Sequence, residues 1–206
     1  GEGIGLFRTE FLFMDRQSEP SEEEQFEAYK AVAEGLKGKP VIIRTLDIGA
    51  DKQIGYFDLP KEDNPAMGMR ALRICLTRPE IFKTQLRALF RASAFGKLGI
   101  MFPMVTNLED WDEAMRLVAH CRQLLRERGE EFDPDTPFGV MFGVPSACLT
   151  AEEFVAHGCG FFVIGTNDLT QYTHAVDREL APAEHYYRPA SKAMKKLIRM
   201  VMDTAK

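Results

Sequence analysis

The chain has 206 residues, which is enough for one domain with a sizeable core. Apolar residues make up 45% of the chain and charged residues 28%, which excludes a disordered tail or a collagen-like protein, and no apolar run reaches the roughly 18 residues of a membrane span. A formal net charge of −5 argues weakly against non-specific binding of nucleic acid.

Apolar runs alternate with helical patterns along the chain. Short apolar runs predict strands at 4–7, 41–43, 98–103, 138–142 and 161–164. Amphipathic patterns predict helices at 21–36, 77–96, 107–128, 146–157 and 191–205. Capping boxes at Ser21–Glu24 and Thr77–Glu80 mark two helix starts, and Asn107 can cap a third. The residues from Gly49 to Met69 lack periodicity and predict a long loop of the kind that carries function.

The predicted strands are continuous in their apolar character, which indicates a parallel sheet covered on both faces. An open doubly wound sheet and a (β/α)8 barrel both fit this alternation. Polar residues directly follow several strands, at Arg8–Glu10, Arg44–Asp47 and Thr166–Asp168, and convergence from many strand ends favours the barrel. Five strands cannot close an eight-stranded barrel, so we predict a partial α/β barrel that forms a single domain over residues 1–206.

The four cysteines, Cys75, Cys121, Cys148 and Cys159, have no metal-binding spacing and lie in no nucleophile motif. Scattered cysteines in a chain of this size indicate buried thiols in a reducing compartment, and therefore a cytoplasmic location.

Arginines follow the predicted strands or lie in the loops behind them, at Arg8, Arg44, Arg70 and Arg178. Lys52 lies close to Arg44 in the sequence. Arginine binds phosphate and carboxylate groups through two parallel hydrogen bonds, and a guanidinium buried at a barrel mouth needs an anionic partner. We therefore expect an anion site, in which like charges crowd one another when no ligand is bound.

The alternative is that each arginine pairs with an acid of its own at the surface. Such pairs would join Arg8 to Glu10, Arg44 to Asp47, and Arg178 to Asp177 or Glu179. Exposed pairs of this kind contribute only about 0–1 kcal/mol and would leave no shared pocket.

Asn167 and Asp168 lie in the run Gly165–Tyr172, which is rich in hydrogen-bonding groups. An Asn-Asp pair after a strand is often only a turn or a helix cap. Aspartate also suits Mg²⁺, which favours one or two carboxylates together with a substrate phosphate, although one carboxylate alone makes a poor site.

Several runs resemble signatures of the phosphoenolpyruvate-utilising enzymes. They are residues 3–14, 43–49, 64–70, 91–96, 164–173 and 175–178. Within that group, the segments Asp47–Lys52 and Arg91–Gly96 are most similar to the Enzyme I family of the bacterial sugar phosphotransferase system, and less similar to pyruvate phosphate dikinase. The resemblance covers essentially the whole chain.

The resemblance implies barrel strands two to six of a (β/α)8 fold that binds phosphoenolpyruvate and Mg²⁺ at its C-terminal face. It assigns the phosphate and carboxylate of the substrate to Arg8, Arg44, Lys52, Arg70, Asn167 and Arg178, and it makes Asp168 a metal ligand. In this family the phosphate passes to a histidine of the same polypeptide and then to a phosphocarrier protein, for sugar uptake. The family also implies a homodimer.

Three departures from the family pattern affect the expected activity. Gly143 occupies the position of a metal-binding glutamate, so we expect Mg²⁺ binding to be weakened or lost. The catalytic cysteine that follows the seventh strand has no counterpart among the four cysteines. None of the four histidines, His120, His157, His174 and His185, has the setting of the phosphate acceptor.

We therefore expect a phosphotransferase segment that holds no catalytic residue and is inactive alone. The alternative is a truncated or degenerate homologue that binds a phospho-ligand weakly or only assembles with partners. A doubly wound phosphosugar-binding domain is a third reading.

Overall fold

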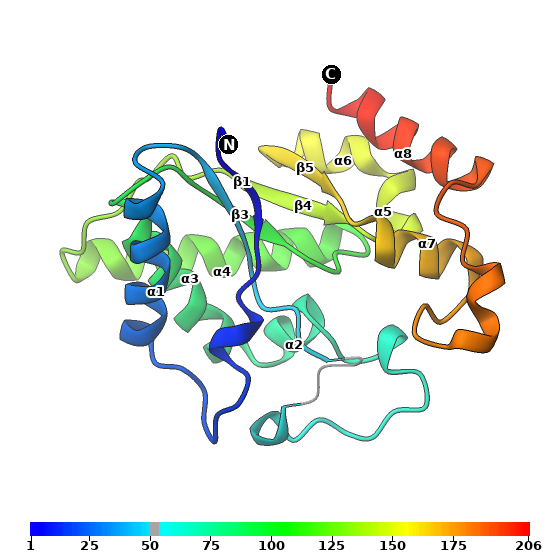
Figure 1. The fold of residues 1–206 in the computed structure, drawn as a ribbon. Helices are drawn as coiled ribbons and strands as arrows, with labels where there is room; N and C mark the ends of the chain where they lie inside the picture. Colours follow the sequence, from blue (N-terminus) through cyan, green and yellow to red (C-terminus); the bar gives the residue numbers. More distant parts are fainter. Residues whose placement is uncertain (50–53) are drawn as a thin grey trace. The chain divides into compact units, whose positions relative to one another are not determined.

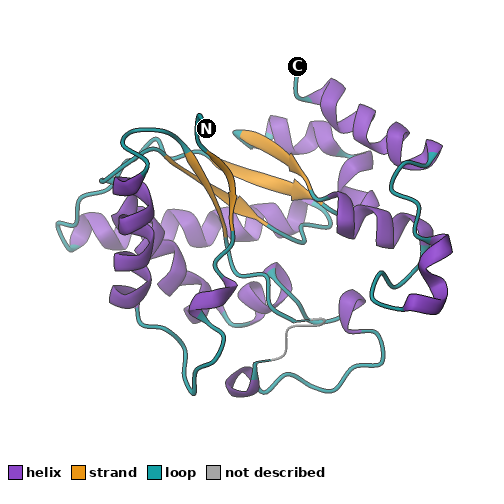
Figure 2. Ribbon diagram, in the orientation of Figure 1, coloured by secondary structure: helices purple, strands orange, loops and turns teal. Residues whose placement is uncertain are grey.

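The computed structural model describes residues 1–49 and 54–206 (Figure 1). Its strands are β1 (Ile4–Phe7), β2 (Val41–Arg44), β3 (Leu98–Phe102), β4 (Phe138–Phe142) and β5 (Phe161–Ile164). They form one sheet in the order β1-β2-β3-β4-β5, and β1 with β2, β2 with β3, and β4 with β5 pair in parallel (Figure 2). This order has no switch point, so the doubly wound alternative is wrong, and successive parallel β/α units are the arrangement of a partial (β/α)8 barrel.

The helices are α1 (Glu22–Gly35), α2 (Leu72–Thr77), α3 (Pro79–Ser93), α4 (Leu108–Glu127), α5 (Pro145–Leu149), α6 (Ala151–Ala156), α7 (Thr166–His174) and α8 (Lys192–Thr204). Short 3-10 turns occur at Glu10–Leu12, Gly55–Phe57, Pro65–Met67 and Ala181–Tyr186. All five predicted strands are confirmed to within one residue at either end. Within the part of the chain that the structure describes, no helix has the length and apolar character needed to cross a membrane.

Side-chain caps explain two of the predicted helix starts. Ser21 accepts a hydrogen bond from the Glu24 amide through Oγ, and the Glu24 carboxylate accepts one from the Ser21 amide at 2.7 Å, which confirms the capping box. Asn107 Oδ1 accepts a hydrogen bond from the Asp110 amide at 3.0 Å, as expected of a cap.

The capping box predicted at Thr77 is wrong. Thr77 is the last residue of α2, and its hydroxyl donates to the carbonyl of Arg73 at 2.8 Å, so it is not available to cap α3. Helix α3 begins instead at Pro79, whose fixed φ suits the first helical position. The helix predicted at 146–157 is divided at Thr150 into α5 and α6.

The described residues form two compact units, and the prediction of a single domain over residues 1–206 remains a prediction. The first unit contains residues 1–101 and 113–137, and the second contains residues 102–112 and 138–206. The core of the second unit contains Phe142 and Phe154, whose ring centroids lie 5.7 Å apart. Trp111 packs edge-on against Phe154, with 6.5 Å between the ring centroids. Helices α1 and α3 contact each other in the first unit, where Glu22 of α1 forms an ion pair with Arg87 of α3 at 2.6 Å.

Each terminal strand of the sheet order, β1 or β5, has one strand neighbour among the described residues. Unpaired backbone groups along a sheet edge favour pairing with another chain. We expect the 206-residue chain, prepared alone, to be non-monomeric in solution. Light scattering at micromolar concentration measures this directly, and a clean monomer would contradict the expectation.

The four cysteines are free thiols, and three of them, Cys75, Cys121 and Cys148, are buried. Burial raises the pKa of Cys75 to about 12 and that of the other three, Cys159 included, to about 11. Since only the thiolate reacts with iodoacetamide, we expect slow alkylation of the native chain at about pH 8 and rapid alkylation in denaturant. Mass spectrometry of each cysteine peptide checks this, and fast native labelling at any of the four would be inconsistent with it.

Candidate functional site

Two buried arginines and two buried carboxylates form a cluster at the carboxyl end of β2. Arg44, only 6% exposed, contacts Glu10 Oε1 through Nη2 at 3.0 Å and Asp47 Oδ2 through Nη1 at 2.9 Å. Arg70, 5% exposed, contacts the other Asp47 oxygen through Nη2 at 3.0 Å. The formal charges of these four side chains cancel, which offsets part of the cost of burying two guanidinium groups.

The local fold brings these segments together. Strands β1 and β2 are parallel with Phe7 opposite Ile43, so the residues that follow both strands emerge at the same edge of the sheet. The loop after β2 then returns to this edge, where the Ala71 amide donates to the Ile48 carbonyl at 2.8 Å.

Gly49 is required at the close approach of the returning loop. Its φ is +105°, and a Cβ atom there would come within 2.6 Å of the Met69 carbonyl oxygen and 2.7 Å of Arg70 Cβ. Only glycine fits this position, so the backbone that carries Arg70 can lie against the residues that follow Asp47.

The ion pairs of these arginines differ in part from the separate surface pairs that were the alternative interpretation of the sequence. Arg44 does pair with Asp47, but the pair is buried and Asp47 is shared with Arg70. Glu10 pairs with Arg44 rather than with Arg8. Arg8 itself is exposed and makes no ion pair with the residues that the structure describes. Lys52, the other predicted ligand of this region, lies outside the described residues.

A network of neutral polar side chains supports the cluster, and sequence analysis did not find it. Gln85 of α3 donates through Nε2 to Thr9 Oγ1 and to the Tyr29 hydroxyl, and accepts from the Leu46 amide. The available signal was a polar residue on the apolar face of a helix, since Gln85 lies four residues from both Ile81 and Leu89, which are buried.

The second unit holds the remaining predicted site residues. Asp168, in the first turn of α7, contacts Arg178 Nη1 through Oδ1 at 3.3 Å. The side chains of Asp168 and Arg178 are 14% and 29% exposed. Arg178 Nε lies 3.5 Å from Glu179, and the Arg178 amide donates to the buried Gln171 side chain at 2.9 Å. Gln171, which sequence analysis did not single out, therefore holds the Arg178 backbone against α7.

Asn167 is exposed at the start of α7, and the hydroxyl of Tyr187 lies 3.4 Å from its Oδ1. Sequence analysis gave a turn or a helix cap as the ordinary interpretation of the Asn-Asp pair, and the structure places both residues in the first turn of α7, with Gly165 at the N-cap.

Position 143 lies directly beside Asp168. A Cβ atom built on Gly143 would lie 3.2 Å from Asp168 Cβ and 3.8 Å from Asp168 Oδ2. A carboxylate at this position would therefore adjoin the Asp168 carboxylate, but glycine supplies none. Within the described ranges, no three His, Cys, Asp or Glu side chains are grouped so that they could hold a metal ion. At this place the described residues offer a cation the Asp168 carboxylate, and Gly143 adds no side-chain oxygen.

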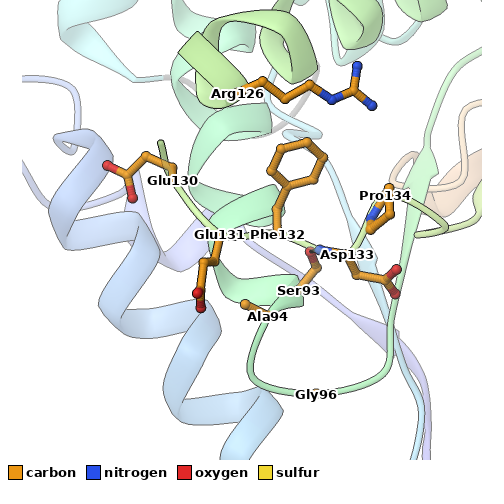
Figure 3. Close-up of a pocket in the computed structure, with 9 residues that line it drawn as sticks. All are labelled: Ser93, Ala94, Gly96, Arg126, Glu130, Glu131, Phe132, Asp133 and Pro134. Atoms are coloured by element: carbon orange, nitrogen blue, oxygen red, sulfur yellow. Dashed lines mark hydrogen bonds between the residues drawn. The ribbon is translucent and has the colours of Figure 1, made fainter. Parts of the chain in front are cut away.

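The pocket in Figure 3 lies elsewhere in the first unit. Its volume is about 740 Å³, and its lining residues precede β3 and β4 in the chain. Arg126 lines the pocket together with three carboxylates, from Glu130, Glu131 and Asp133. The net negative charge of this lining disfavours an anionic ligand.

A smaller pocket, of about 350 Å³, lies in the loop after β2. Gly49 and Met69 line it, so the pocket adjoins the backbone that carries Asp47 and Arg70. The charged side chains that line this space are Lys61, Asp58 and Glu62, so its one positive charge is offset by two carboxylates.

Comparison with known proteins assigns the family. The chain matches the family described as PEP-utilising enzyme, PEP-binding domain, over residues 1–206. It belongs to the PEP-utilising enzymes. Two proteins named phosphoenolpyruvate-protein phosphotransferase, from Staphylococcus carnosus and from Haemophilus influenzae, are each 52% identical to this chain over 99% of its length. The Bacillus subtilis protein of that name is 47% identical over 100% of the chain.

The chain spans about a third of the length of these relatives, 35% for the first two and 36% for the Bacillus subtilis protein. The PEP-binding domain assignment agrees with the partial barrel and with the family resemblance seen in the sequence.

Proposed function

We propose that this chain is the phosphoenolpyruvate-binding part of a phosphoenolpyruvate-protein phosphotransferase. The observation that carries the proposal is the pair of buried guanidinium groups, Arg44 and Arg70, that meet at Asp47 after β2 in a member of the PEP-binding domain family. Phosphoenolpyruvate carries a phosphate and a carboxylate, the two groups that arginine binds best.

On this proposal the ligand competes with Glu10 and Asp47 for the two guanidinium groups. The positive charges then lie against the phosphoryl oxygens, where they stabilise the charge distribution of the transition state. Transfer breaks the bond between phosphorus and the enol oxygen and forms one between phosphorus and a histidine nitrogen of the longer polypeptide. The enolate released takes up a proton and becomes pyruvate.

Arg8, Lys52, Asn167 and Arg178 complete the proposed ligand set. Their assignment rests on the family motif, and the exposed positions of Arg8 and Asn167 leave both side chains accessible to a ligand.

We further propose that the longer protein passes phosphate to a phosphocarrier protein for sugar uptake, works as a homodimer and is cytoplasmic. The names of the relatives support a protein acceptor, and the free cysteines are compatible with a reducing compartment.

Gly143 favours a second candidate, a homologue that binds the phospho-ligand without transferring it. A single carboxylate, already paired with Arg178, makes a weak magnesium site. We therefore propose that Mg²⁺ contributes little to ligand binding by this chain.

Calorimetric titration of phosphoenolpyruvate into the 206-residue chain, with and without Mg²⁺, tests the proposal. We expect saturable binding in both conditions, with little change on adding the metal. Inorganic phosphate and pyruvate, titrated separately, serve as controls for the two halves of the ligand. Absence of binding, or equal affinity for phosphate alone, would refute the proposed ligand.

A further inference from the structure

We propose that Gln85 of α3 is a positioning residue for the anion site, because it fixes the two segments that carry Glu10, Arg44 and Asp47. The inference rests on the proposed function, since it treats the arginine cluster as the ligand site. It goes beyond that function by assigning a role to a residue that lies outside the cluster and carries no charge.

Gln85 is 1% exposed and reaches from a helix to the ends of two strands. Its Oε1 accepts a hydrogen bond from the Leu46 amide at 2.9 Å, and Leu46 lies between Arg44 and Asp47 in the chain. Its Nε2 donates to Thr9 Oγ1 at 3.2 Å, and Thr9 is the residue before Glu10. One amide group therefore holds both sides of the Arg44–Glu10 ion pair.

The hydrogen bonds around Gln85 determine which way its amide faces. Thr9 Oγ1 donates to the Arg44 carbonyl at 3.0 Å, so its single proton is used and it can only accept from Gln85. Leu46 presents an amide N–H, which needs an acceptor. The Gln85 oxygen must therefore face Leu46 and its nitrogen must face Thr9.

The second Nε2 hydrogen of Gln85 is also used. It donates to the Tyr29 hydroxyl at 3.0 Å, and that hydroxyl donates in turn to Gln25 Oε1 at 3.0 Å. Gln25 Nε2 donates to the Pro20 carbonyl at 3.1 Å, which extends the chain of bonds to the start of α1. Burial raises the pKa of Tyr29, which keeps this hydroxyl protonated.

Every hydrogen bond in this network has a defined direction. An apolar side chain of the same size in place of Gln85 would therefore leave the Leu46 amide without an acceptor and the Thr9 hydroxyl oxygen without a donor. The expected consequence is a shift of the strand ends rather than loss of a ligand contact. Small displacements of binding groups cost a large share of affinity, because charged contacts depend on exact geometry.

The test compares phosphoenolpyruvate affinity in matched variants of the 206-residue chain. Gln85→Met keeps the volume and removes the hydrogen bonds, and we expect the dissociation constant to rise at least about tenfold. Gln123→Leu removes an exposed hydrogen bond to Glu127 and serves as the surface control. Leu86→Ala destabilises the same helix from its buried apolar face without touching the network. Both controls should bind like the parent well below their unfolding temperatures.

Thr9→Val provides a second variant if Gln85→Met does not fold. It removes the links from Thr9 to Gln85 and to the Arg44 carbonyl but keeps the Leu46 bond. We expect a smaller rise in the dissociation constant, accompanied by a changed NMR resonance of the Arg44 guanidinium group. Leu86→Ala should leave that resonance in place.

The outcomes separate the two claims. Loss of affinity in the network variants but not in Leu86→Ala supports the positioning role. Parental affinity in both network variants, or an equal loss in Leu86→Ala, overturns it. Arg44→Ala tests the site itself. If that variant binds phosphoenolpyruvate like the parent, the proposed function fails. If affinity is lost in Arg44→Ala but in neither network variant, the proposed function stands and only the role of Gln85 is removed.

Discussion

Replacing Arg44 by alanine is expected to abolish measurable phosphoenolpyruvate binding and to lower the free energy of unfolding by about 3–5 kcal/mol. The loss of binding follows because a buried, charge-assisted contact to the ligand disappears. The loss of stability follows because Arg44 holds Glu10 at 3.0 Å and Asp47 at 2.9 Å in the folded chain. Its removal leaves buried negative charge without adequate compensation.

Urea unfolding and calorimetric titration measure the two effects of Arg44→Ala separately. Arg16→Ala is the matched control, because the Arg16–Glu24 pair is exposed and is expected to contribute only about 0–1 kcal/mol. An Arg44→Ala chain that is as stable as the parent would contradict the buried pairing. The crowding of like charges expected from the sequence is not what the structure shows, because Glu10 and Asp47 offset the two arginines.

Replacing Gly143 by glutamate is expected to make phosphoenolpyruvate binding depend on Mg²⁺, with an affinity gain of about tenfold or more when the metal is present. Position 143 adjoins Asp168, with 3.2 Å between the two Cβ positions, so a second carboxylate would share a cation with the first. Without metal the two carboxylates repel each other, and we expect the variant to be less stable than the parent.

Gly143→Gln is the control for this substitution, since it adds the same bulk without the charge. Titrations of both variants, at several Mg²⁺ concentrations, distinguish coordination from packing. An unchanged response in Gly143→Glu would show that the metal is not held beside Asp168. Glu10 and Asp47 are poor substitutes as ligands because Arg44 and Arg70 already pair with them.

Sequence patterns predicted the sheet well because each strand is a continuous apolar run that is bounded by prolines, glycines or charges. They also directed attention to Arg8 and Arg44, which directly follow apolar runs; Arg44 lies in the buried cluster, whereas Arg8 is exposed. The patterns could not predict that Glu10 pairs with Arg44 across 34 positions, because that choice depends on the register of β1 against β2.

Other errors have local causes. Thr77 had the sequence of a helix cap, but α2 extends to that residue and uses its hydroxyl. The run from Thr166 to His174 begins with residues typical of turns and caps, and it forms α7, in which Leu169 and Thr170 are fully buried. The role of Gln85 depends on three partners from three separate segments, so no short sequence window contains it.

The order of the strands has a consequence for synthesis on the ribosome. Each strand is placed beside the one made just before it, so β2 can pair with β1 as soon as α1 and β2 have emerged, and β3 can then add to β2. Each of the five described strands pairs with a strand that is adjacent to it in the sequence order, and contacts between nearby segments form quickly. All four charged members of the arginine cluster have been synthesised once Arg70 has been added, and Gln85, which holds two of their segments, follows in α3. Each arginine of the cluster is therefore synthesised after at least one of its carboxylate partners, Arg44 after Glu10 and Arg70 after Asp47.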